Sequence, residues 1–146
     1  MKPVDFAAEL GKFFDARFKA ANMPASAGDM VFLVGGYDEK EACGHVYEVK
    51  IPSAPVPVEL NSGTFGLSMG GQTDIAARLF QGVSIPFQFL PLQDCVDLSI
   101  LVIKTTAGLM KYATAIRGVG GAIDVATITR AEGFRDVQLK RILGER

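Results

Sequence analysis

Two neighbouring segments with strand patterns place the strongest constraint on the fold of this chain. Met30–Val34 is an apolar run bounded by Asp29 and a glycine pair, and a short run rich in strand formers predicts a buried strand. Gly44–Ile51 alternates between apolar and polar residues. One face of this second strand holds His45, Tyr47, Val49 and Ile51. Because only a polar turn separates the two segments, we expect an antiparallel hairpin.

Three other segments have the apolar spacing that is typical of amphipathic helices. They are Pro3–Ala21, Gln72–Gln81, and Pro91 to about Ile116. Pro91 suits the first helical turn, where its missing N–H costs no hydrogen bond. The first helix carries four phenylalanines, Phe6, Phe13, Phe14 and Phe18. A partner-binding helix is one interpretation of this stripe, but a stripe that packs in the core is the more frequent outcome and is what we expect.

The segments between these helices predict further strands and one irregular connection. Pro52–Pro57 contains three prolines and is expected to be irregular, because proline donates no hydrogen bond to a neighbouring strand. Strands are predicted at Thr64–Met69, Ile123–Thr129 and Phe134–Leu139. Helices and strands are grouped along the chain, which favours an α+β fold with antiparallel hairpins over a parallel doubly wound sheet. The length of 146 residues suits a single domain, residues 1–146.

Composition excludes several classes of function. The 15 basic and 16 acidic residues give a net charge of -1, whereas a nucleic-acid binder needs a clustered basic face. No apolar run approaches the roughly 18 residues of a membrane span, and no secretory signal is evident, so we expect a cytoplasmic protein without a membrane partner. Cys43 and Cys95 form no CxxC pair, and no metal or cofactor is predicted.

The chain has one histidine, His45, in the alternating strand beside Tyr47. No acidic partner for this side chain is evident from the sequence. We therefore expect a partly exposed histidine within a sheet rather than a general base. A single histidine also makes histidine-based metal clusters and Ser-His-Asp catalysis improbable.

Several segments, taken in chain order, carry a resemblance to a known family. They are Val34–Asp38 followed by Gly44–Val49, Met69–Thr73 opening a helix, the long helix after Pro91, and Gly118–Thr129 followed by Glu132–Arg135. In this order and spacing they resemble the C-terminal two-thirds of a proteasome-like subunit of the Ntn-hydrolase superfamily, of the uncharacterised bacterial type. The resemblance implies part of an αββα sandwich, with antiparallel sheets between helix layers and the N-terminal strands missing.

The same resemblance implies a threonine-type peptidase whose nucleophile is the first residue of the mature chain. Here the chain begins with Met1, and its first helix matches a helix from the middle of the family fold. A serine that the family commonly has before the start of a helix corresponds to Gly70 here. An aspartate and a serine of the family correspond roughly to Ile116 and Val119. No catalytic residue is therefore predicted. We expect a catalytically incomplete subunit or fragment that associates with the missing N-terminal half or with another copy.

Two alternatives remain open at this point. One is a non-catalytic assembly or peptide-binding protein that forms oligomers. The other is a small-ligand enzyme that uses the loop around Gly70 and Gly71, although a structural turn is the favoured interpretation of that loop. The candidate residues for a substrate cleft or binding loop are Ser68, Gly70, Gly71 and Gln72.

Overall fold

The computed structural model of the protein describes residues 1–24, 26, 28–39, 41–112 and 119–138. The chain divides into two compact units, Met1–Gly71 and Gln72–Arg146, and each is described by itself. Within the described residues the structure is mixed α+β, with an antiparallel sheet in each unit, as the sequence predicts. None of the helices in this part of the chain is long and apolar enough to cross a membrane.

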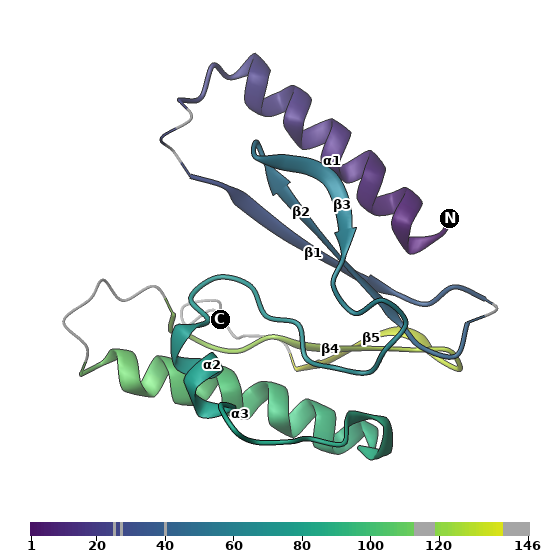
Figure 1. Ribbon diagram of the computed structural model, residues 1–146, viewed down its shortest axis with the longest axis vertical. Coiled ribbons are helices and arrows are strands. Elements are labelled where there is room, and N and C mark those ends of the chain that lie inside the picture. Colours follow the sequence, from purple (N-terminus) through teal and green to yellow (C-terminus); the bar gives the residue numbers. More distant parts are fainter. Residues whose placement is uncertain (25, 27, 40, 113–118, 139–146) are drawn as a thin grey trace, which may run out of the picture. The chain divides into compact units, whose positions relative to one another are not determined.

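The first unit consists of one helix and a three-stranded antiparallel sheet (Figure 1). In chain order its elements are α1 (Pro3–Ala20), β1 (Met30–Gly36), β2 (His45–Ile51) and β3 (Ala54–Glu59). The strands lie in the order β1–β2–β3, and the register of β1 and β2 places Met30 opposite Ile51. The predicted hairpin of the first two strands is therefore confirmed.

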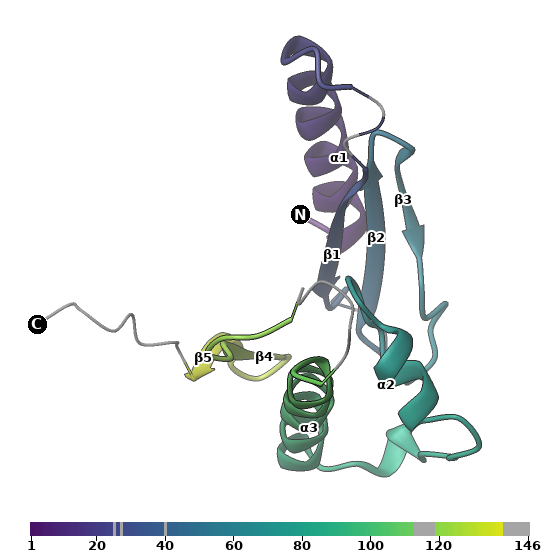
Figure 2. The same ribbon diagram turned by 90° about the vertical axis from the view of Figure 1, so that its left-hand side faces the viewer.

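Helix α1 lies along one face of this sheet, and the core of the unit forms between them (Figure 2). The buried core residues are Ala7, Phe18, Val34, Val49 and Ile51. The rings of Phe14 and Phe32 pack beside them, with centroids 4.6 Å apart. Because a helix on a sheet buries only one stripe of its surface, Phe6 and Phe13 remain exposed, and their predicted place in the core is wrong.

At Gly11 the helix lies directly against the backbone of the sheet. This residue is buried within α1. A Cβ atom at this position would collide with the backbone carbonyl oxygen of Pro55 and would lie 3.3 Å from a methyl group of Val49. The absence of a side chain at Gly11 therefore sets the distance between α1 and β3.

Strand β3 shows that the prediction of an irregular connection at Pro52–Pro57 was wrong from Ala54 onward, whereas Pro52 and Ser53 form a turn. Pro55 and Pro57 lie within β3, and the strand order makes β3 an edge strand. An edge strand tolerates proline where the missing N–H would face away from the sheet. Because the two prolines are two residues apart, their backbone nitrogens point to the same side of the strand.

The segment Thr64–Met69, predicted to be a strand, is irregular. Asn61 organises the chain just before it: the side-chain Nδ2 donates to the carbonyl oxygen of Gly44 over 2.6 Å. The Asn61 Oδ1 atom accepts the backbone N–H of Val46 over 2.9 Å. Side-chain hydrogen bonds of this kind hold the loop against β2 in place of a continuing backbone ladder.

In its described residues, 72–112 and 119–138, the second unit contains two helices, a short 3₁₀ helix and a two-stranded sheet. In chain order its elements are α2 (Asp74–Leu79), η2 (Phe87–Phe89), α3 (Leu92–Met110), β4 (Val125–Thr129) and β5 (Gly133–Gln138). α2 packs against α3, and α3 packs against β4. The predicted helices and the last two strands are confirmed within these bounds. The expected end of the long helix near Ile116, and Leu139, lie outside the described residues.

The close approach at Gly11 generates a stability prediction. Gly11→Ala is expected to lower the free energy of unfolding by about 1–3 kcal/mol, because overpacking at Pro55 outweighs the better helix propensity of alanine. Gly108→Ala in α3, where a Cβ would meet nothing within 4 Å, is the matched control and should stabilise by about 0.5–1 kcal/mol. Urea unfolding followed by circular dichroism measures both variants. Equal effects of the two substitutions would contradict the account of Gly11.

Candidate functional site

The most organised group of polar side chains in the first unit surrounds His45, at the start of β2. The His45 side chain is buried, at 8% relative exposure, and contacts a carboxylate at each ring nitrogen. Nδ1 lies 2.8 Å from Oε1 of Glu59, the last residue of β3. Nε2 lies 2.9 Å from Oε2 of Glu41 in the loop between β1 and β2. We call these three residues the His45 clasp.

The two contacts of the imidazole ring differ in quality. The contact with Glu59 has hydrogen-bond geometry. The contact with Glu41 has the distance of an ion pair but not the angle of a hydrogen bond. Glu41 is the more exposed of the two carboxylates. Glu59 is therefore the main partner, and Glu41 adds charge at the opposite end of the ring.

Other groups of the first unit complete the electrostatic surroundings of the clasp. The ring of Tyr47 is stacked with that of His45, with centroids 6.1 Å apart. Asp38, in the loop after β1, forms an ion pair of 2.9 Å with Lys2 at the start of α1. The positive charge of Lys2 is thus matched by Asp38, and two carboxylates remain to interact with His45.

These contacts determine the protonation state of the clasp. The hydrogen bond to Glu59 raises the pKa of His45 above its usual value; burial acts in the opposite direction, and the charges of Glu41 and Glu59 add to the increase. The pKa of Tyr47 is also raised, by burial and then by the same two carboxylates. Both carboxylates therefore favour the protonated form of the His45 ring over the neutral form, and they favour the protonated form of the neighbouring Tyr47 as well.

A histidine engaged in this way acts as a structural clasp rather than as a catalytic base. In the imidazolium form both ring nitrogens carry hydrogen, so neither offers a lone pair to a metal or to a substrate proton. Within the described ranges, no group of three or more His, Cys, Asp or Glu side chains is arranged to hold a metal ion. The clasp ties the loop after β1 and the end of β3 to the start of β2.

The structure overturns the expectation that His45 is partly exposed and lacks an acidic partner. The error follows from the missed strand β3: the register of β2 and β3 places Glu59 opposite Tyr47, two residues from His45. A signal was present in the sequence, because Val56 and Val58 alternate with Pro57 and Glu59 as residues of a strand do. Glu41 lies four residues before His45, where the direction of the loop was not predictable.

The predicted candidate loop lies where the two units meet in the sequence, with Ser68, Gly70 and Gly71 in the first unit and Gln72 in the second. Ser68 is half-buried in the irregular segment, and the other three residues are exposed. Gly71 has a φ of +80°, which glycine adopts without strain. The following helix α2 has six residues. Their role in a binding loop stays a prediction.

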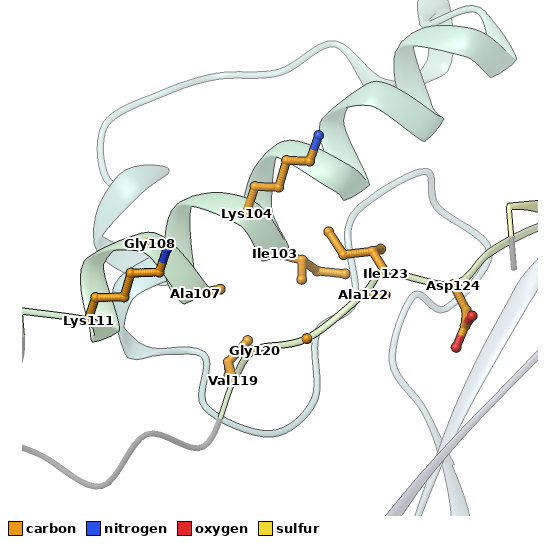
Figure 3. A pocket seen from close by; sticks show the side chains of 11 residues that line it. Ile103, Lys104, Ala107, Gly108, Lys111, Val119, Gly120, Ala122, Ile123 and Asp124 are labelled. Carbon is orange, nitrogen blue, oxygen red and sulfur yellow. The ribbon is translucent and has the colours of Figure 1, made fainter. Parts of the chain in front are cut away.

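A cavity of about 850 Å³ lies in the second unit between α3 and the segment Val119–Asp124 (Figure 3). Ile103 of α3 and Ile123 of the segment point toward one another, and Lys104 points away along the helix (Figure 3). The charged residues among the described lining are Lys104, Lys111 and Asp124.

Comparisons of the chain with protein-family models, with curated proteins and with solved structures found no match.

The His45 clasp predicts a specific pH dependence. Because His45 is the only histidine in the chain, its Cε1 proton signal in an NMR titration needs no assignment, and the pKa is expected to exceed the ordinary value of about 6.5. A raised folded-state pKa contributes its full stabilisation below about pH 6.5, and the contribution is lost as the pH rises through the folded-state pKa. The urea midpoint should fall over that interval.

Two glutamine variants separate the clasp from other ion pairs. Glu59→Gln is expected to lower the free energy of unfolding by about 1.5–3 kcal/mol at pH 6 and to make that free energy depend less on pH. Glu48→Gln breaks the 2.8 Å ion pair with Lys50 on β2 and should leave that dependence unchanged, because lysine does not titrate in this range. A histidine pKa at or below 6.5 in the wild-type chain would contradict the clasp.

Proposed function

We propose that this chain is the scaffold part of a proteasome-like Ntn-hydrolase subunit, in which its antiparallel sheets belong to an αββα sandwich. In such a sandwich each sheet is covered by helices on one face and by the other sheet on its second face. The chain would then provide walls and subunit contacts around a peptide-hydrolysing site. The observation that carries the proposal is the uncovered apolar face of the first sheet.

The first sheet has two faces of different character. Its α1 face contains the core of the unit. Four valine and leucine side chains on the opposite face are exposed, on either side of the Glu48–Lys50 ion pair of the central strand β2: Val31, Leu33, Val56 and Val58. They alternate with more buried neighbours along β1 and β3. A strand that is apolar on both faces is typical of a sheet that is buried on both sides.

The second unit also exposes large apolar side chains on its sheet. α3 packs against β4, while Ile128 of β4 and Phe134 of β5 lie directly opposite one another in the register and are exposed. An exposed cross-strand pair of this size also favours burial by another layer. Both sheets therefore expose large apolar side chains, with Glu48 and Lys50 among them on the first sheet and Asp136 beside them on the second.

The role proposed for this chain within such a subunit is structural. Its single histidine has a carboxylate at both ring nitrogens, so we assign it no part in peptide hydrolysis. The threonine chemistry of the family is likewise assigned to none of the residues of this chain. Scaffold residues in this proposal include the candidate loop Ser68–Gln72, because a Cβ at Gly70 would lie 3.4 Å from the side chain of Leu33 on the uncovered face.

A second candidate function is peptide binding by strand addition in a non-catalytic assembly protein. Among the described strands β1 is an edge strand. Natural edge strands commonly carry charged residues or proline that block pairing with another chain. The residues of β1, Met30–Gly36, include neither. A fluorescently labelled peptide distinguishes the candidates. An increase in the fluorescence anisotropy of the peptide, without its cleavage, favours strand addition. Cleavage by the purified chain would contradict both.

The sandwich proposal predicts that two equally exposed valines respond differently to a charge. Val58 on the uncovered face is 56% exposed and Val83 in a loop is 57% exposed. Val58→Lys should lower the free energy of unfolding of the assembled protein by at least about 2 kcal/mol, because the layer that covers this face would bury a third charge beside Glu48 and Lys50, which already neutralise one another. Val83→Lys should change it by no more than about 0.5 kcal/mol.

Urea unfolding of both variants, with light scattering to record the mass of the particle, measures this difference. A defined particle that Val58→Lys destabilises and Val83→Lys does not supports the sandwich. Equal, small effects of the two substitutions would show that the face of Val58 stays in contact with water and would contradict the proposal.

A further inference from the structure

The outward face of α1 carries two aromatic rings that the core of the first unit does not use. Phe6 is 50% exposed and Phe13 is 54% exposed. They are seven residues apart, which places them on the same side of the helix two turns from one another. Burial of α1 against the sheet occurs at Ala7, Gly11 and Phe18, on another side of the helix. The two rings therefore form an apolar stripe on the surface.

Charged and small residues continue this stripe on either side of Phe13. Glu9 lies four residues before Phe13 and Arg17 lies four residues after it. The guanidinium carbon of Arg17 is 5.3 Å from the centre of the Phe13 ring. Ala20, seven residues after Phe13, is exposed and small. The stripe is thus negative on one side of Phe13 and positive on the other.

We propose that α1 binds α1 of a second copy of this chain in an antiparallel pair, with the two-fold axis at Phe13. A two-fold axis there places Glu9 opposite Arg17 of the second copy, because both lie four residues from Phe13. It also places Phe6 opposite the small side chain of Ala20. The stripe is therefore complementary to itself in charge and in shape, which identifies the second copy as the partner.

The ion pairs within α1 leave this surface able to associate. Glu9 contacts Lys12 over 2.8 Å, with both side chains largely exposed, and such pairs contribute little and rearrange easily. Each copy would contribute two phenylalanine rings that are already about half buried, so the four rings would add about 300–500 Å² to the contact. The contact is smaller than specific interfaces usually are, so the expected dimer is weak, with a dissociation constant on the order of 100 micromolar.

Charge reversal on α1 tests the pairing. Glu9→Arg and Arg17→Glu each place like charges opposite one another twice in every dimer, and each should weaken dimerisation by at least about tenfold. The double variant exchanges the two charges and should restore the dissociation constant to within about threefold of wild type. Sedimentation velocity over a concentration series measures these constants, and circular dichroism checks that each variant is folded.

Lys19→Glu is the matched control, because Lys19 pairs with Asp15 of its own helix over 2.7 Å and lies off the stripe. It should leave dimerisation unchanged. A double variant that dimerises as weakly as the single variants would overturn the proposal. Single variants that dimerise as strongly as wild type would overturn it as well. The proposal does not depend on the sandwich: association lost in Val58→Lys and kept in Glu9→Arg would assign the contact to the sheet and overturn the α1 pairing alone.

Discussion

A single helix covers only one of the two faces of a sheet, and this constraint governs the first unit of the protein. α1 packs on the β1–β2–β3 sheet through a narrow contact at Gly11, which brings the helix against the backbone of Pro55. The hydrophobic core lies wholly on that side. Valine and leucine side chains on the other side remain at least 39% exposed, and the need to remove them from water underlies the proposed function.

The His45 clasp performs a different task within the same unit. It joins a loop, the start of β2 and the end of β3 through a buried imidazole and two carboxylates. A buried ion pair is weak evidence for net stability, because removing its charges from water offsets much of their attraction. Its clearer consequence is specific geometry: the pairing fixes where β3 ends, and the exposed face of β3 is positioned with it.

The sequence was sufficient to predict the hairpin, the helices and the α+β class, because those elements have clear periodicity. It was insufficient for β3, where Pro55 and Pro57 obscured an alternating pattern that an edge strand tolerates. The site depends on that strand, so the partners of His45 were missed together with it. Phe6 and Phe13 were misplaced for another reason: helical spacing alone does not distinguish a stripe that packs inside a unit from one on its surface.

Solvent access to the uncovered sheet face is the most direct test of the central claim. Val58→Cys and Val83→Cys, each made in a chain whose Cys43 and Cys95 are replaced by serine, would be labelled with a thiol reagent under native conditions. The account predicts that the thiol at position 58 reacts at least about tenfold more slowly than the thiol at position 83, because a second layer covers the sheet. Equal rates, matching the equal exposure of Val58 and Val83 in this structure, would contradict it.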